Sequence, residues 1–346
     1  MGHLGDPLNT FWQLFFRHAG TSRWTNEVEA TGVATNGGLV LATSGGDSLA
    51  VGVEPSNLLT FSPLLATSDN GSSWATGLLP EGLARRPDAL ATSASGMSLA
   101  LVGSGRASKV VVRGSDTSLW VTLSAESMLV SSPSGRACGI GQVTAVAYAG
   151  STPVIGASCG APGVVGIFAD DHGAWRLAGA LLPSSVAQGR VEVLGLQATT
   201  NPSADAGRPR TGLSALLAVS GASGTSLVAA WSSDGASAWS EAAGPVLGGD
   251  EQPASYGTAS DNKIFVLLAG KTGIDRLFVV AGTQSSWRQL PSPPPGTATI
   301  ASGPSGSLDA LVTHDTVLSV WVLAPKVTRW VKGQVIDVPI QFGSSS

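Results

Sequence analysis

Short apolar runs alternate with small polar turns along the whole chain. The runs are rich in Val, Leu and Ala, and Gly, Ser, Asp and Pro border them. This pattern is typical of short β-strands joined by tight turns. Seven of the turns end in a tryptophan, at intervals of 43 to 64 residues: Trp24, Trp74, Trp120, Trp175, Trp239, Trp287 and Trp330.

Each interval divides into four apolar runs. Four-strand units that repeat at this spacing, each with one aromatic marker, are typical of the blades of a β-propeller. The sequence therefore predicts an all-β fold, a seven-bladed β-propeller of four-stranded antiparallel blades. In the unit that follows the first tryptophan, the predicted strands are 38–44, 48–54, 61–68 and 73–79.

The two ends of the chain differ from the repeats between them. The chain enters at a Trp-ended hairpin, residues 10–27, and leaves with an extra apolar run at 335–342. We expect this run to pair with the hairpin, because such a closure removes the exposed strand edges of an open ring. The alternative is six blades, with the hairpin packed on the rim. Residues 1–7 and 343–346 are expected to be disordered tails of a single domain, 1–346.

One Trp-ended turn carries a specific motif. Thr67, Asp69, Gly71, Ser73 and Trp74 have the spacing (S/T)-x-D-x-G-x-(S/T)-W, which resembles the Asp-box of bacterial neuraminidase (BNR) repeats. In such a turn Asp accepts hydrogen bonds from backbone amides, Gly takes a conformation that other residues resist, and Trp packs beside the hairpin. The resemblance implies a structural role, distant from any active site. Degraded copies contain Asp116, Asp171 with Gly173, and Ser232 with Asp234 and Gly235.

A resemblance to sialidases would also imply a particular set of catalytic residues. Those enzymes use three arginines that clamp a carboxylate, a tyrosine nucleophile paired with a glutamate, and an aspartate acid/base. Of the two tyrosines here, Tyr148 lies in an apolar run and is expected in the core. Tyr256 follows Asp250 and Glu251 and has the only setting that suits a nucleophile. The Arg-Ile-Pro signature of the family is missing after Arg17, so we do not expect a sialidase.

The low charge of the chain argues against several classes of protein. Charged residues are 12% of the composition, and the net charge is −4 with 19 Lys and Arg that form no basic run. These values disfavour nucleic-acid binding and long amphipathic helices. No apolar stretch reaches membrane-spanning length. We expect no cofactor and no metal site, because the histidines lack the spacing of metal ligands: His3, His18, His172 and His314.

The two cysteines flank a predicted hairpin. Cys138 and Cys159 bound two apolar runs with a turn at Gly150 and Ser151. A hairpin of this length brings its ends together, so a disulfide is sterically feasible; two buried free thiols are the alternative. A disulfide fits an exported protein, and the Met-Gly-His start is interpreted as a trimmed end that has lost an export signal. We therefore expect a secreted or cell-surface protein, and a monomer.

The scarce charged residues gather in the links between predicted blades. In a four-stranded blade the 1–2 and 3–4 turns share one face of the ring, the Asp-box face, and the 2–3 turns and linkers share the other, the linker face. Ligands of propellers usually bind on the linker face. Arginine suits an anionic or hydroxyl-rich ligand, and tyrosine can stack on a sugar. The alternative is that loops are simply where charge belongs. The predicted site consists of Glu81, Arg85, Arg86, Arg136, Asp250, Glu251 and Tyr256.

The longest unit contains an insertion at residues 199–212, with Arg208 and Arg210. Counting strands places it among the 1–2 loops, where it is either a solvated loop or a docking site for a partner.

We expect an exported, non-enzymatic β-propeller that acts as a recognition or scaffold module for a glycan or a protein partner. The alternative is a carbohydrate-active hydrolase with an active site on the linker face. A hydrolase needs two carboxylates roughly 5–10 Å apart. A channel without convergent charge would favour the recognition module.

Overall fold

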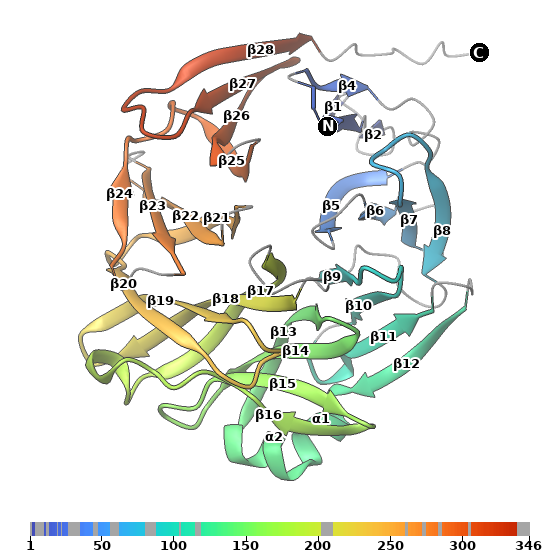
Figure 1. Ribbon diagram of the computed structural model, residues 1–346, viewed down its shortest axis with the longest axis vertical. Coiled ribbons are helices and arrows are strands. Elements are labelled where there is room, and N and C mark those ends of the chain that lie inside the picture. Colours follow the sequence, from blue (N-terminus) through green and yellow to red (C-terminus); the bar gives the residue numbers. More distant parts are fainter. Residues whose placement is uncertain are drawn as a thin grey trace.

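A computed structural model gives the structure of the protein. It describes residues 2–3, 10–11, 14–18, 20–21, 23–26, 35–43, 48–55, 62–79, 88–103, 105–114, 119–201, 210–259, 262–271, 275–282, 286–303 and 306–337. The fold is all-β and propeller-like, with the sheets arranged around a central axis (Figure 1).

Four of the sheets contain four strands each, and in each sheet the strands pair antiparallel in chain order. The first contains β5 (Thr35–Thr43), β6 (Leu49–Pro55), β7 (Ser62–Thr67) and β8 (Ala75–Leu79). The second contains β9 (Ala89–Thr92), β10 (Ser98–Val102), β11 (Lys109–Arg113) and β12 (Trp120–Ala125). The last two contain β21 (Gln252–Thr258), β22 (Lys263–Ala269), β23 (Arg276–Ala281) and β24 (Arg288–Leu290), and then β25 (Thr297–Ser302), β26 (Leu308–His314), β27 (Val317–Leu323) and β28 (Val331–Asp337).

A larger sheet of eight strands lies between these pairs of sheets in the chain. It consists of two four-stranded meanders joined by a short ladder, in which Ser158 pairs with Glu192 and Cys159 with Val191. The first meander contains β13 (Ile140–Ala149), β14 (Thr152–Cys159), β15 (Gly166–Asp171) and β16 (Ala174–Leu177). The second contains β17 (Arg190–Asn201), β18 (Arg210–Gly221), β19 (Gly224–Ser232) and β20 (Ser240–Val246).

The hydrophobic core lies between neighbouring four-stranded units. Val154 and Ile167 of one meander pack in a cluster with Val193, Leu217 and Val228 of the next. A central strand such as β10 is buried along its whole length. A strand with sheets on both faces needs apolar side chains on both, which explains why the strands contain so little charge.

The strands predicted between residues 38 and 79 match β5–β8, but the predicted C-terminal strand 335–342 is wrong in its first part. Residues 335–337 extend β28, where Val335 lies opposite Ser319 of β27. The β27–β28 ladder has a register irregularity between Ser319 and Trp321. Residues 338–342 lie outside the described residues.

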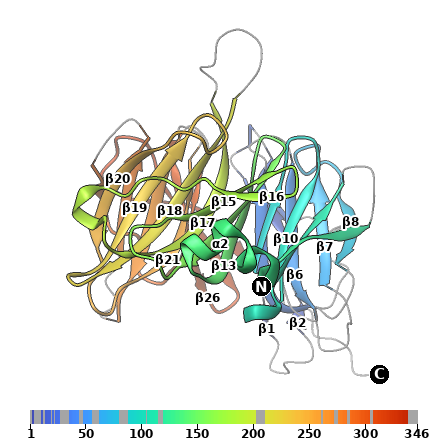
Figure 2. The ribbon, with the colours of Figure 1, turned by 90° about the horizontal axis from the view of Figure 1, so that it is seen from below.

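Two short helices occupy a segment that the sequence analysis treats as a linker. They are α1 (Glu126–Ser131) and α2 (Pro133–Cys138), and both lie on the outside of the ring, α2 beside β16 and α1 beside β12 and β13 (Figures 1 and 2). The Oγ of Ser132 accepts a hydrogen bond from the Gly135 N–H at 2.9 Å, and Gly139 ends α2 in the left-handed conformation. No helix in the described part of the chain is long and apolar enough to cross a membrane.

A disulfide joins Cys138, the last residue of α2, to Cys159 at the end of β14, with an S–S distance of 2.02 Å. The two strands between them turn at Gly150 and Ser151, as predicted. The disulfide therefore fixes the two helices to the sheet.

The N-terminal residues form two short ladders. β1 (Gly2–His3) pairs with β2 (Thr10–Phe11), and β3 (Phe15–Phe16) pairs with β4 (Thr25–Asn26). On one side the β3–β4 hairpin contacts the first full sheet: the Phe16 ring meets the Trp74 ring edge-on at 5.7 Å, and His18 Nδ1 lies 3.0 Å from the carbonyl oxygen of Asn70.

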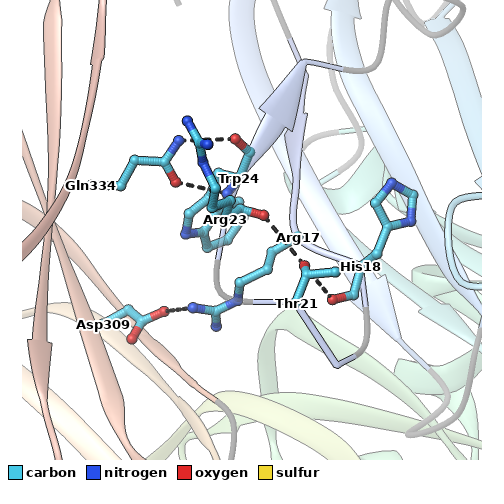
Figure 3. Close-up of polar contacts among 7 residues, drawn as sticks. All are labelled: Arg17, His18, Thr21, Arg23, Trp24, Asp309 and Gln334. Atoms are coloured by element: carbon cyan, nitrogen blue, oxygen red, sulfur yellow. Dashed lines mark hydrogen bonds and ion pairs between the residues drawn. The ribbon is translucent and has the colours of Figure 1, made fainter.

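On its other side the hairpin contacts the last sheet (Figure 3). Arg17 Nη1 lies 2.6 Å from Asp309 Oδ2, and Gln334 binds the backbone of Trp24. Within the described ranges β28 forms no ladder with β4, and side-chain contacts join the hairpin to the sheets on its two sides. Pairing of residues 338–342 with the hairpin stays a prediction.

Candidate functional site

A cavity of about 370 Å³ follows the axis of the ring. Its wall comes mainly from the first strand of each four-stranded unit: β5, β9, β13, β17, β21 and β25. None of the described residues that line it is charged. We call this cavity the central channel.

Hydroxyl and amide groups line the channel near the ends of its strands. All of these first strands run in the same direction, so the ends that lead into the 1–2 turns gather at one mouth. This mouth is on the Asp-box face, and the expectation of a site on the linker face is therefore not met by the channel. The Thr258 N–H donates to Oε1 of Gln197 at 3.1 Å across two units. The polar wall residues toward this mouth are Thr43, Thr92, Gln197, Thr258 and Ser302.

Hydrogen bonds also connect successive first strands around the channel. Oγ1 of Thr144 in β13 donates to the carbonyl of Val193 in β17 at 2.6 Å. Oγ of Ser255 in β21 lies 3.1 Å from both the N–H and the carbonyl of Ile300 in β25. The wall from β13 to β25 is therefore cross-linked, so its polar groups are held in place before any ligand arrives.

Tyr256 lies in β21 and forms part of the channel wall. Its hydroxyl donates to the carbonyl of Leu194, and its ring lies so close to Gly195 that a Cβ there would be 2.3 Å from Cε2. Burial, with a smaller contribution from the charge of Glu192, raises the pKa of the Tyr256 phenol. The phenol is therefore a neutral donor whose partner is a backbone carbonyl, and within the described ranges no hydrogen bond joins it to a glutamate, although the charge of Glu192 is close enough to act on it.

Tyr148 is buried, at 1% exposure, and also lines the channel. Its hydroxyl has no hydrogen-bond partner among the described residues, and burial raises the pKa of this phenol well above its usual value. The expected core position is correct, and the unpaired hydroxyl adds a donor beside the cavity.

Two of the other predicted site residues lie near one another at the entrance to β21. Glu251 accepts a hydrogen bond from the Gly248 N–H at 2.7 Å and forms a two-point ion pair with Arg276, with Nε to Oε1 at 2.6 Å. These contacts, with Arg276 the larger cause, lower the pKa of the Glu251 carboxyl. Asp250 is exposed beside it. Glu251 thus holds a loop and does not face the channel wall.

The structure places none of the remaining predicted site residues beside Tyr256. Arg136 is exposed in the last turn of α2, outside the ring, and donates to the carbonyl of Ser131. Glu81, Arg85 and Arg86 lie outside the described residues. Sequence analysis missed Gln197 and its neighbours because it searched for charge. Gln197 could have been found from its place in the repeat, because it lies in the first strand of its unit and the first strands of a propeller face the axis.

The turn between β7 and β8 has the hydrogen bonds that its motif predicts. Oδ1 of Asp69 accepts from the Ser73 N–H at 2.9 Å and from Oγ1 of Thr67 at 2.8 Å, and the Gly71 N–H donates to that Oγ1 at 2.9 Å. The bonds from Ser73, then Thr67, lower the pKa of Asp69 to about 2. Gly71 has a φ of +79°, and the Phe16 ring packs against it.

The turn between β19 and β20 has the same geometry despite its shifted glycine. Ser232 donates to Asp234 at 2.8 Å, and the Ala236 N–H donates to Ser232 at 3.0 Å. Ala236 has a φ of +73°, so an alanine occupies the position that Gly71 has in the first turn, and Gly235 corresponds to Asn70. When the turns at 67–74 and 232–239 are aligned by their hydrogen bonds, the shifted glycine of the second turn is explained.

A third Trp-ended turn differs from its predicted form. Asp170, and not Asp171, accepts the hydrogen bond from the Gly173 N–H at 2.9 Å. Adjacent aspartates made this choice ambiguous in the sequence. Asp116 lies outside the described residues. Across the described ranges, no group of three or more His, Cys, Asp or Glu side chains is placed to hold a metal ion.

No family model matches the chain, and no curated protein matches its sequence. Solved structures match its fold. A GH74 xyloglucanase from Xanthomonas campestris superposes with a TM-score of 0.52 at 12% identity, over 87% of this chain and 47% of that one. A proposed 6-phosphogluconolactonase from Bacteroides uniformis has a TM-score of 0.50 at 15% identity, over 94% and 96%. The SapL1 lectin in complex with α-methyl fucoside has a TM-score of 0.48 at 12% identity, over 88% and 97%.

These solved structures are β-propellers. The identities are low, so the likeness shows the fold alone. The chain spans 47% of the length of the xyloglucanase.

Proposed function

We propose that the protein is a non-catalytic recognition module that binds a neutral, hydroxyl-rich ligand, a glycan, in its central channel. The observation that carries this proposal is the chemistry of the channel wall. Its described residues supply hydroxyls, an amide and a phenol, and no charge. Such groups match the hydroxyls and apolar faces of a neutral sugar, and a cavity of about 370 Å³ is of ligand-binding size.

The same wall argues against hydrolysis in the channel. Glycoside hydrolysis needs one carboxylate as acid and another as base or nucleophile. No carboxylate is among the described residues of the wall, and Glu251 is engaged with Arg276. The xyloglucanase likeness supports a shared fold and does not supply these groups.

The proposed architecture is a closed ring of seven blades related to Asp-box propellers. Six four-stranded units account for β5–β28, and the β3–β4 hairpin would form the reduced seventh blade. Its contacts with Trp74 on one side and Asp309 and Gln334 on the other support this arrangement. The disulfide supports an oxidising, exported location for the protein, and we propose that it is a monomer.

A glycan array tests the proposal, followed by hydrolysis assays on every glycan that is bound. We expect binding without product. Tyr256→Ala and Gln197→Ala should weaken binding at least tenfold, whereas Arg136→Ala, outside the ring, should leave it unchanged. Release of a reducing sugar from a bound glycan would overturn the non-catalytic assignment. Binding that is insensitive to both channel variants would overturn the location.

A further inference from the structure

A recess of about 60 Å³ borders the central channel between β17 and β21. A space of about 10–15 Å³ already holds one water molecule, so the recess has room for a small chemical group. Half of its described lining also lines the channel: Leu196, Gln197, Tyr256, Gly257 and Thr258. The rest of the described lining is small or apolar and carries no charge: Gly195, Ser214, Ala215, Leu216 and Ile264. We call it the β17–β21 recess.

Two side chains reach across this recess in opposite directions. Oε1 of Gln197, in β17, accepts from the Thr258 N–H of β21 at 3.1 Å. The hydroxyl of Tyr256, in β21, donates to the carbonyl of Leu194 in β17. Each strand therefore sends one polar side chain to the backbone of the other, and these contacts fix what each side chain still offers to a ligand.

The contact of Gln197 leaves it as a donor. A backbone N–H only donates, so the oxygen of the amide must face Thr258 and the nitrogen must face away from it. Nε2 has no hydrogen-bond partner among the described residues, and it is not one of their buried unpaired side-chain atoms. Gln197 therefore presents N–H groups in a wall that the channel and the recess share.

Tyr256 has the complementary polarity. Its single hydroxyl proton is committed to the Leu194 carbonyl, so Oη offers lone pairs and no further proton. The residue is 42% exposed, and it lines both the channel and the recess. A ligand group that contacts this pair must therefore accept from Gln197 and donate to Tyr256.

The pair departs from the wall that other units repeat. The strands β5 and β9 each contribute Leu, Ala and Thr to the channel, at 41–43 and 90–92, and β25 contributes Ile, Ala and Ser at 300–302. At the corresponding place β17 has Gln197 and β21 has Tyr256. Since the repeated wall forms without an amide or a phenol, these two side chains give one side of the channel its own chemistry.

An amide group meets the demands of the pair in one rigid unit, because its carbonyl accepts and its N–H donates. A carboxylate only accepts and an ammonium only donates, so neither satisfies both side chains. Two sugar hydroxyls can match the polarity, but they leave the small and apolar lining of the recess without an apolar partner. An acetamido group adds a methyl, whose burial against such a lining is favourable.

We propose that Gln197, Tyr256 and the β17–β21 recess recognise the acetamido group of an N-acetylated sugar. The carbonyl of the ligand accepts from Nε2 of Gln197, its N–H donates to Oη of Tyr256, and its methyl enters the recess. The inference rests on the proposed function, because it names the kind of neutral glycan that the central channel selects.

Titration calorimetry on the whole chain tests this with the methyl glycosides of glucose, N-acetylglucosamine and N-formylglucosamine, and with the same three of the galactose series. In at least one series the N-acetyl glycoside should bind about tenfold or more tightly than its parent sugar, which lacks the amide. It should bind about threefold or more tightly than the N-formyl glycoside, which keeps the amide and lacks the methyl.

Two variants test the pair. Gln197→Glu keeps an oxygen for Thr258 and replaces the donor by an acceptor, and Tyr256→Phe removes the acceptor. Each should bring the ratio of N-acetyl to parent affinity toward one. The matched control is Gln142→Glu, at an exposed position of β13, which introduces the same charge and should leave the ratio unchanged. Circular dichroism on each variant confirms that the fold is intact.

The outcomes separate this inference from the proposed function. Equal affinity for the N-acetyl and parent glycosides, or for the N-acetyl and N-formyl glycosides, overturns acetamido recognition and leaves glycan binding in place. A preference that survives both Gln197→Glu and Tyr256→Phe overturns the assignment to this pair. If the glycan array shows binding only of glycans without an acetamido group, the inference fails and the proposed function stands. If the array shows no binding, both fail.

Discussion

The side chain of Gln334 binds the backbone of Trp24 through both ends of its amide (Figure 3). The Trp24 N–H donates to Oε1 at 2.7 Å, and Nε2 donates to the Trp24 carbonyl at 3.0 Å. The two residues are 310 positions apart. A side-chain amide offers the same donor and acceptor as a backbone peptide, so Gln334 binds Trp24 as one residue of a neighbouring strand would.

Gln334→Ala should lower the free energy of unfolding by about 1–3 kcal/mol, because it removes two hydrogen bonds and leaves half-buried backbone groups unpaired. Urea denaturation measures the change. Gln289→Ala is the control, since Gln289 is an exposed strand residue. Equal small losses in the two variants would show that Gln334 does not tie the ends together.

Arg17→Met should cost about 3–5 kcal/mol at neutral pH, because it leaves the carboxylate of Asp309, at 1% exposure, without its partner. Burial already raises the pKa of Asp309, and Arg17 opposes that rise. In the variant the pKa rises further. An acid whose folded pKa is raised loses stability as the pH rises from about 3.9, the unfolded value, through the folded value.

The loss in Arg17→Met should therefore be largest at neutral pH and should shrink as the pH is lowered. Arg17→Met combined with Asp309→Asn should recover part of the stability at pH 7. A loss that is the same at every pH, with no recovery in the double variant, would contradict the pairing.

Asp69→Asn should flatten the acid side of the stability profile. The folded pKa of Asp69 is lowered to about 2, so its contribution is present above about 3.9 and disappears as the pH falls through about 2. Thermal unfolding of wild type and variant between pH 2 and 7 measures this. The two profiles should converge at low pH. Asp337→Asn, at an exposed position on β28, is the control. Parallel profiles for Asp69→Asn and wild type would contradict a stabilising role for the Asp69 carboxylate in the turn.

Unreduced protein should resist alkylation at Cys138 and Cys159, which the disulfide joins. Replacing both cysteines by alanine should lower the free energy of unfolding by about 3 kcal/mol, because the disulfide closes a loop of about 20 residues in the unfolded chain. Mass spectrometry and denaturation give the two readouts. Two alkylated thiols in the unreduced protein would refute the disulfide.

The sequence predicts the repeated sheets better than it predicts their ends. Apolar runs and tight turns identify β5–β8 because their inner strands bury apolar side chains, such as Val51 of β6 and Leu65 of β7. The run 335–342 looked like a separate strand because no turn residue in the sequence marks where the outermost strand of the last unit, β28, ends. The helix α2 could have been found from Pro133 near its start and Gly139 after its end.

The candidate site was harder to predict from sequence. Charge drew attention to Arg136 and Glu251, which the structure places on an outer helix and in a loop ion pair. Gln197 and Tyr148 lie in apolar strands that look like core. Only the ring arrangement shows that these strands border a cavity, because the cavity is formed by units far apart in the chain.

Gly195→Ala provides the most direct test of recognition in the central channel. Its methyl group would lie 2.3 Å from the Tyr256 ring and must displace it. Calorimetry should show that the best glycan from the array binds Gly195→Ala at least tenfold more weakly than wild type, with no hydrolysis by either protein. Gly221→Ala, where a Cβ meets nothing within 4 Å, should bind like wild type. Equal affinity in Gly195→Ala and wild type, or any turnover of the glycan, would contradict a non-catalytic glycan site in the channel.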